Sequence, residues 1–155
     1  GPLALGRLTM GARNVGVRGM GRAGARSALT ALGVMSLIYA GGVLLMDATV
    51  GGLTGSAASS ASIASMLVTL LLIVALIFSE VRAYRAVVAS VPFEPGMGDK
   101  ALLGLSLWFV GGMPLGIANL VRAVALGGVG DVRQILIQLG VSVALVLLTY
   151  PKFRA

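Results

Sequence analysis

Four long apolar runs constrain the fold of this chain more than any other feature. Each run is long enough for an α-helix to cross the hydrocarbon core of a bilayer, which takes about 17 to 25 residues. The runs cover Ala28–Met46, Ile63–Ser79, Ala101–Gly127 and Val132–Tyr150. Only 11% of the residues are charged and the mean hydropathy is +1.00, values too apolar for the surface of a soluble domain. The sequence therefore predicts an all-α integral membrane protein with four transmembrane helices.

The segments between the runs predict how the chain is divided. Residues 47–62 are small and nearly uncharged after Asp47, so we expect a flexible connection there. The second run continues as a helical pattern through residue 90, until Pro92 and Pro95 break it. We therefore expect the chain to have four parts: a basic arm at 1–27, a hairpin at 28–90, an inner-side linker at 91–100, and a second hairpin with a basic tail at 101–155.

Helix ends and one kink are also predicted. Asp99 is placed to cap the third helix, and Asp131 with Gln134 forms a pattern like a capping box before the fourth. Pro151 is expected to end the fourth span. In the third span, Gly111, Gly112 and Pro114 predict a bend or a locally opened turn.

The distribution of basic residues predicts the orientation. Ten of the twelve lysines and arginines fall in the N-terminal arm, the 80–100 region and the C-terminal tail, while Arg122 and Arg133 belong to the opposite side. The positive-inside rule then puts both termini on the cytoplasmic, matrix or stromal side. The membrane itself is not identified; an organellar inner membrane or a thylakoid is compatible with this pattern.

The N-terminal arm is basic and rich in glycine. Residues 1–46 hold five arginines and no acid, which in composition resembles an organelle transit peptide. Seven glycines in residues 1–26 disfavour a stable isolated helix, so we expect a flexible arm on anionic headgroups or an acidic partner. The arm has no aromatic residue to stack on bases, so nucleic acid is not an expected partner. At the inner end of the second span, a ring is expected of Glu80, Arg82, Tyr84 and Arg85, in which the arginines and the tyrosine are interfacial anchors. The candidate contact residues are Arg13, Arg18, Arg22, Arg26, Arg82 and Arg85.

An internal repeat relates the two halves. A shift of 70 residues aligns 31–48 with 101–118 at eight identical positions of eighteen, and chance similarity between apolar helices is the alternative. A true repeat predicts two tandem hairpins in the same orientation. Glycines within the spans allow close helix packing. The candidates are Gly41, Gly42, Gly111, Gly112, Gly116 and Gly140.

Few residues could carry chemistry. The chain has no cysteine and no histidine, which excludes disulfides, thiolate chemistry and imidazole ligands. A pair of catalytic aspartates, Asp47 with Asp131, lacks a distinctive motif, so we expect no enzyme activity and no metal. No cofactor is evident, although Trp108 and Phe109 suit contact with a helix, a bound lipid or a hydrophobic pigment. The polar residues expected at membrane depth are Asn119, Arg122 and Gln138; Arg122 can snorkel or pair with Asp47 or Asp131.

These observations favour a non-catalytic role. Short loops, small residues on the helices and a basic arm are typical of a structural or assembly subunit of a larger membrane complex. The alternative is a channel or carrier for a small solute or ion, built on the duplicated hairpin. That alternative needs a polar track, and the sequence shows scattered small residues instead.

Overall fold

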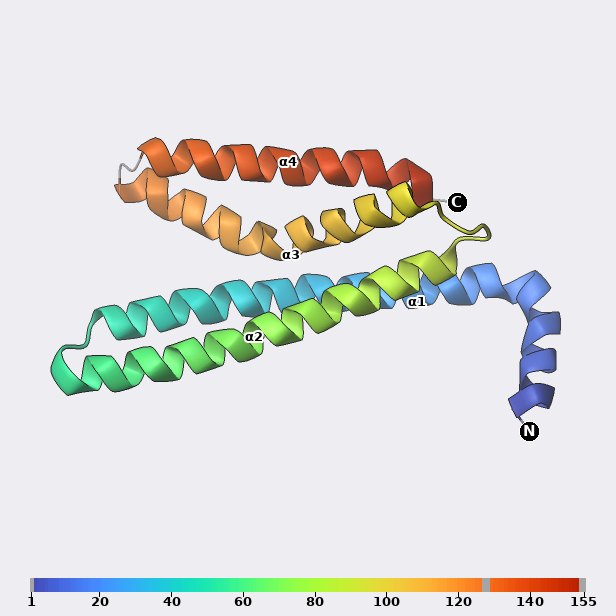
Figure 1. Ribbon diagram of the computed structural model, residues 1–155, viewed down its shortest axis with the longest axis horizontal. Coiled ribbons are helices and arrows are strands. Elements are labelled where there is room, and N and C mark those ends of the chain that lie inside the picture. Colours follow the sequence, from blue (N-terminus) through green and yellow to red (C-terminus); the bar gives the residue numbers. More distant parts are fainter. Residues whose placement is uncertain (1, 127–128, 154–155) are drawn as a thin grey trace.

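The computed structural model describes the backbone of residues 2–126 and 129–153, and the side chains of residues 21–125 and 132–153. Four helices make up this part of the chain, and no strand occurs in it (Figure 1). They are α1 (Pro2–Gly51), α2 (Gly55–Ser90), α3 (Met97–Leu126) and α4 (Val129–Phe153). The predicted all-α fold is therefore confirmed.

All four helices contain a stretch long and apolar enough to cross a membrane. These stretches are Gly21–Gly51, Gly55–Ser90, Met97–Ala125 and Val132–Phe153. At 1.5 Å per residue, the 36 residues of α2 extend about 54 Å, well beyond a hydrocarbon core of about 30 Å. The closed end of the α1–α2 pair accordingly reaches further than that of α3 and α4 in Figure 1.

Two expectations about non-helical segments are wrong. The connection expected at 47–62 shrinks to residues 52–54, because the alanines and serines after Gly55 extend α2 and α1 continues to Gly51. The arm expected to lack helix belongs to α1 from Pro2 onward. Once the apolar span has nucleated a helix, each added residue gains one hydrogen bond, and the Ala, Leu, Met and Arg between the glycines are good helix formers.

The other helix ends lie close to their predicted positions, although two of them differ in detail. α2 ends at Ser90, and Val91 is extended before Pro92, as expected for a residue that precedes proline. Asp99 was expected to cap α3, but α3 begins at Met97, so Asp99 lies in its first turn instead. Pro151 was expected to end the last span, but α4 continues through it to Phe153. The cap predicted from Asp131 lies outside the described side chains.

The chain is arranged as two antiparallel hairpins. α1 packs on α2, where Gly21 faces Ser90 and Gly42 faces Leu72. α4 packs on α3, and α3 is the helix of the second hairpin that contacts both α1 and α2. Figure 1 shows α3 bent in its middle, as the Gly-Gly-x-Pro sequence predicts, with the bend directed toward the first hairpin. The start of α1, the end of α4 and the α2–α3 connection lie at the same end of the bundle.

The buried core is small and lies mainly between α1, α2 and the first half of α3. Several of its residues are alanines, which let the helix backbones approach closely where lipid removes the hydrophobic driving force. The core residues are Ala25, Ala28, Leu32, Leu76, Ala83, Val87, Leu103 and Leu107. Large apolar side chains cover the remaining helix faces, as expected for surfaces that meet acyl chains.

Residues paired by the 70-residue repeat have mixed environments. Ser36 and Ser106 are both buried. Leu37 is 63% exposed, however, while its counterpart Leu107 is only 6% exposed. The two hairpins thus do not present equivalent faces to each other, and the repeat stays a prediction.

Candidate functional site

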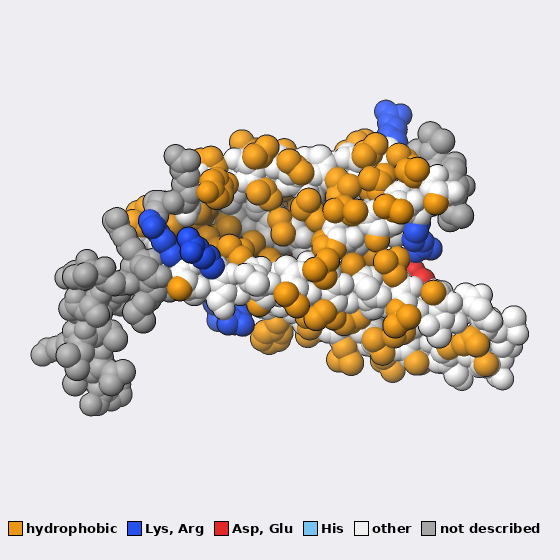
Figure 2. Space-filling view, turned by 180° about the vertical axis from the view of Figure 1, so that it is seen from behind, with side chains coloured by type: hydrophobic (Ala, Val, Ile, Leu, Met, Phe, Trp, Pro, Cys, Tyr) orange, Lys and Arg blue, Asp and Glu red, His pale blue; other side chains and the backbone are white. Residues whose placement is uncertain are grey.

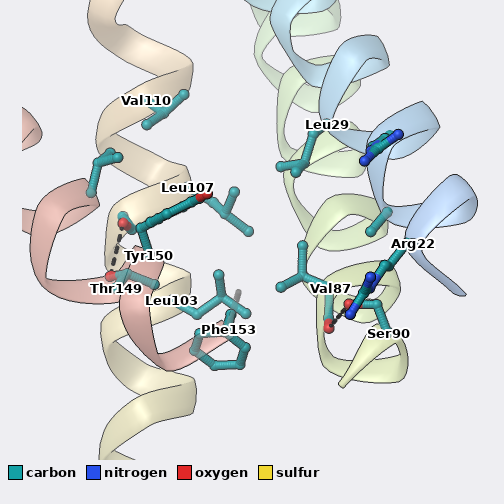
Figure 3. A pocket seen from close by; sticks show the side chains of 14 residues that line it. Arg22, Leu29, Val87, Ser90, Leu103, Leu107, Val110, Thr149, Tyr150 and Phe153 are labelled. Atoms are coloured by element: carbon teal, nitrogen blue, oxygen red, sulfur yellow. Dashed lines mark hydrogen bonds between the residues drawn. The ribbon is translucent and has the colours of Figure 1, made fainter. Parts of the chain in front are cut away.

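Between the hairpins, residues of the described part of the chain line a cavity of about 400 Å³ and a smaller one. We call the larger one the arginine cavity, because two arginines of α1 stand among its lining residues. All four helices contribute to it, with the first hairpin on one side and the second on the other (Figure 3). The lining consists of Arg22, Ala25, Arg26, Leu29, Val87, Ser90, Leu103, Ser106, Leu107, Val110, Val146, Thr149, Tyr150 and Phe153.

The interior of the arginine cavity is apolar. Its serine and threonine hydroxyls are already used within the protein: Ser106 donates to Thr149 Oγ1 over 3.1 Å, and Thr149 donates to the carbonyl of Leu145. Ser90 donates to the carbonyl of Val87 over 2.7 Å (Figure 3). With these groups satisfied, the walls offer an occupant mainly aliphatic and aromatic surface.

The positive charge of the cavity is concentrated at one end. Arg22 and Arg26 lie one turn apart on α1, and both residues are exposed. Figure 3 shows the Arg22 side chain directed toward Ser90, at the end of α2. Viewed from behind, the molecule is hollowed between the two hairpins, with basic side chains beside the hollow (Figure 2). The cavity therefore joins an apolar interior to a basic rim.

The second cavity, of about 210 Å³, surrounds a buried acid. Glu80 is only 8% exposed, and its carboxylate lies against Gly111 of α3. None of the hydrogen bonds or ion pairs made by the described side chains involves Glu80. We call this space the Glu80 cavity; it is lined by Tyr39, Ile73, Leu76, Ile77, Glu80, Trp108, Phe109, Gly112 and Gln138.

Sequence reasoning missed the burial of Glu80. It assigned this residue to the interfacial ring with Arg82 and Arg85, whereas the structure buries it between the hairpins. A signal for this was present, since Leu76, Glu80, Ala83 and Val87 recur at helical spacing and form the buried face of α2. An acid on such a face is a candidate functional residue.

The polar residues predicted at depth do not come together. Arg122 forms an ion pair with Asp47, with Nη1 3.6 Å from Oδ2, and both side chains are more than half exposed. Asn119 is half-buried on α3. Gln138 instead lines the Glu80 cavity from α4. These three residues therefore form no continuous polar track.

The six predicted packing glycines fall into two sets. A Cβ at Gly42 would lie 2.6 Å from Leu72 Cδ1, one at Gly111 would meet Glu80, and one at Gly116 would lie 3.4 Å from Leu139 Cδ2. Helices of the same chain therefore pack against these three. A Cβ at Gly41, Gly112 or Gly140 would meet no atom within 4 Å.

The predicted basic contact residues are also divided by position. Arg22 and Arg26 line the arginine cavity, while Arg82 and Arg85 are exposed on α2 outside it. Arg13 and Arg18 belong to the α1 backbone but lie outside the described side chains.

Within the described part of the chain, no three acidic, histidine or cysteine residues gather as a metal site would require. Comparison with known proteins adds no assignment: no protein-family model, no curated protein and no solved structure matches this chain.

Proposed function

We propose that this chain is a non-catalytic, multi-pass subunit of a larger membrane complex. The observation that carries the proposal is the open position of two glycines, Gly41 on α1 and Gly140 on α4. Both are exposed, and a Cβ at either would meet no atom within 4 Å. In bilayers, small residues mark surfaces where another helix packs closely, since glycine allows two backbones to approach.

Contact with lipid explains the large apolar side chains around these glycines but not the glycines themselves. Leu37 and Leu45 near Gly41, and Leu147 and Leu148 beyond Gly140, are large exposed side chains suited to acyl chains. A glycine among them leaves a notch that fits a protruding side chain or a helix backbone better than mobile lipid.

The orientation belongs to the same proposal. With ten of twelve basic residues toward one end, both termini face the cytoplasmic, matrix or stromal side. The basic start of α1 then meets anionic headgroups or an acidic partner on that side.

The test is the mass of the native particle after gentle solubilisation, with its components identified by mass spectrometry. We expect a large hetero-complex for the unaltered chain and for a Val141→Leu control. We expect its dissociation for Gly41→Leu with Gly140→Leu. A monomer or small homo-oligomer in native membranes overturns the proposal.

Glu80 favours a second candidate, a carrier for protons or small cations. A membrane-buried carboxylate facing a cavity is a common feature of ion pathways. In liposomes containing a pH-sensitive dye, a carrier would conduct, and Glu80→Gln would abolish the flux while Glu94→Gln, an exposed acid paired with Lys100, would not. Absence of protein-dependent flux for protons, Na⁺ and K⁺ would dismiss this candidate.

A further inference from the structure

We infer that the arginine cavity is a binding site for one anionic phospholipid, with an acyl chain inside and its phosphate at Arg22 and Arg26. The inference does not depend on the proposed subunit role, because it concerns the isolated chain and its bilayer.

The size and walls of the cavity suit an acyl chain. Its volume of about 400 Å³ lies within the usual range for small-molecule sites, about 300 to 1,000 Å³. Leu103, Leu107 and Val110 line one wall over about two turns, so the apolar interior extends roughly 10 Å along α3. Water is a poor occupant of such a space, because apolar cavities offer it too few hydrogen bonds. In a bilayer, acyl chains are the apolar molecules present at high concentration.

The position of the cavity matches the depth of a headgroup. Arg22 lies near the start of the apolar part of α1, Ser90 ends α2, and Phe153 ends α4. The polar end of the cavity is therefore at the end of the bundle where apolar spans give way to basic residues. A lipid with its phosphate at this level has its chain directed into the bilayer core, along the cavity.

The charge of the rim selects an anionic headgroup. Neither Arg22 nor Arg26 has an acid within eight residues in the sequence, and none of the ion pairs between described residues involves Arg26. A guanidinium carries five N–H donors in a planar fork, so an intramolecular contact of Arg22 leaves further donors for a phosphate. Lys152, unlike Arg26, forms an ion pair between described residues, with its Nζ 2.8 Å from Asp99 Oδ1.

The experiment uses the full chain purified in dodecyl maltoside, with lipid binding followed by native mass spectrometry. The probes are dioleoyl phosphatidylglycerol, dioleoyl phosphatidylcholine and oleate. We expect each chain to retain one phosphatidylglycerol molecule, in preference to phosphatidylcholine. Arg22→Gln with Arg26→Gln should reduce that preference by at least about fivefold, the effect of a single basic residue near an anionic surface.

Matched variants distinguish lipid binding in the cavity from lipid attraction to the rest of the protein surface. Arg82→Gln with Arg85→Gln removes the same charge from exposed positions outside the cavity and should retain the lipid. Val146→Trp fills the cavity and should prevent binding, whereas Leu147→Trp adds the same side chain to an outward position that is 67% exposed. Arg22→Lys with Arg26→Lys keeps the charge without the guanidinium fork and should give intermediate retention.

Three results would overturn the inference. Equal loss of binding in the Arg82/Arg85 variant would show nonspecific attraction to the basic surface. Retention of phosphatidylcholine equal to that of phosphatidylglycerol would show that the rim does not select charge. If oleate competed as well as phosphatidylglycerol, a carboxylate would serve as well as a phosphate at the arginines. The cavity would then be assigned to a fatty acid. Because the native-particle mass measures partner binding, either proposal can fail without the other.

Discussion

Glu80 of α2 packs against Gly111 of α3, close to the bend by which α3 approaches the first hairpin. A Cβ at Gly111 would lie 3.3 Å from the Glu80 Cδ and 3.5 Å from the Leu76 Cδ1, besides meeting the carboxylate oxygen. The adjacent Gly112 has no atom within 4 Å of such a Cβ. Of the two glycines, Gly111 is therefore the one that packs closely against the first hairpin.

This contact predicts unequal effects of the same substitution at neighbouring positions. Gly111→Leu should destabilise the protein by about 1–3 kcal/mol, because the added side chain forces α3 away from α2. Gly112→Leu should cost less, since the Glu80 cavity has room for it. Denaturation with sodium dodecyl sulfate in mixed micelles, followed by circular dichroism, measures both. Equal losses would contradict the packing seen at Gly111.

The second hairpin is joined by a buried hydroxyl pair, Ser106 and Thr149. Interhelical hydrogen bonds within membranes contribute about 0.6 kcal/mol on average, and at most about 1.7 kcal/mol. We expect a coupling energy in that range from a double-mutant cycle of Ser106→Ala and Thr149→Val. Ser79→Ala is the control, because Ser79 bonds the carbonyl of Ala75 in its own helix. A coupling energy of zero would show that the two hydroxyls do not interact.

The ion pair between Arg122 and Asp47 connects α3 to the end of α1. Both groups are exposed, with side-chain exposures of 52% and 60%, so the pair should contribute only about 0–1 kcal/mol. Arg122→Gln should lower the thermal midpoint slightly more than Arg133→Gln, and high salt should remove the difference. A loss of several kcal/mol for Arg122→Gln alone would mean that lipid, rather than water, surrounds the pair.

The orientation can be tested directly, because the chain has no native cysteine. Single cysteines at Gly52 and Gly96 occupy the α1–α2 and α2–α3 connections, at opposite ends of the bundle. With a membrane-impermeant maleimide, Gly96→Cys should react from the cytoplasmic, matrix or stromal side and Gly52→Cys from the other. Labelling of both from one side would contradict a spanning α2, and reversed labelling would contradict the positive-inside assignment.

Much of the fold could be predicted from the sequence. The number of spans, the helix end before Pro92 and the bend near Pro114 all depend on local properties. Transfer of a segment into lipid depends mainly on the residues of that segment, and proline limits the helix wherever it occurs. The helical start of α1 was missed because glycine content was judged for an isolated peptide rather than for a helix already nucleated by an adjoining span.

Tertiary structure alone decided the candidate sites. Whether Gly41 or Gly42 meets a neighbour, and whether Glu80 faces lipid or the other hairpin, depends on how each helix is rotated about its own axis. In a soluble bundle an apolar stripe reveals that rotation, but a transmembrane helix is apolar on every face. The arginine cavity depends in addition on where α3 bends and on which helices then separate. The sequence by itself thus determined four helices long and apolar enough to cross a membrane, and packing between the hairpins decided which residues line the cavities.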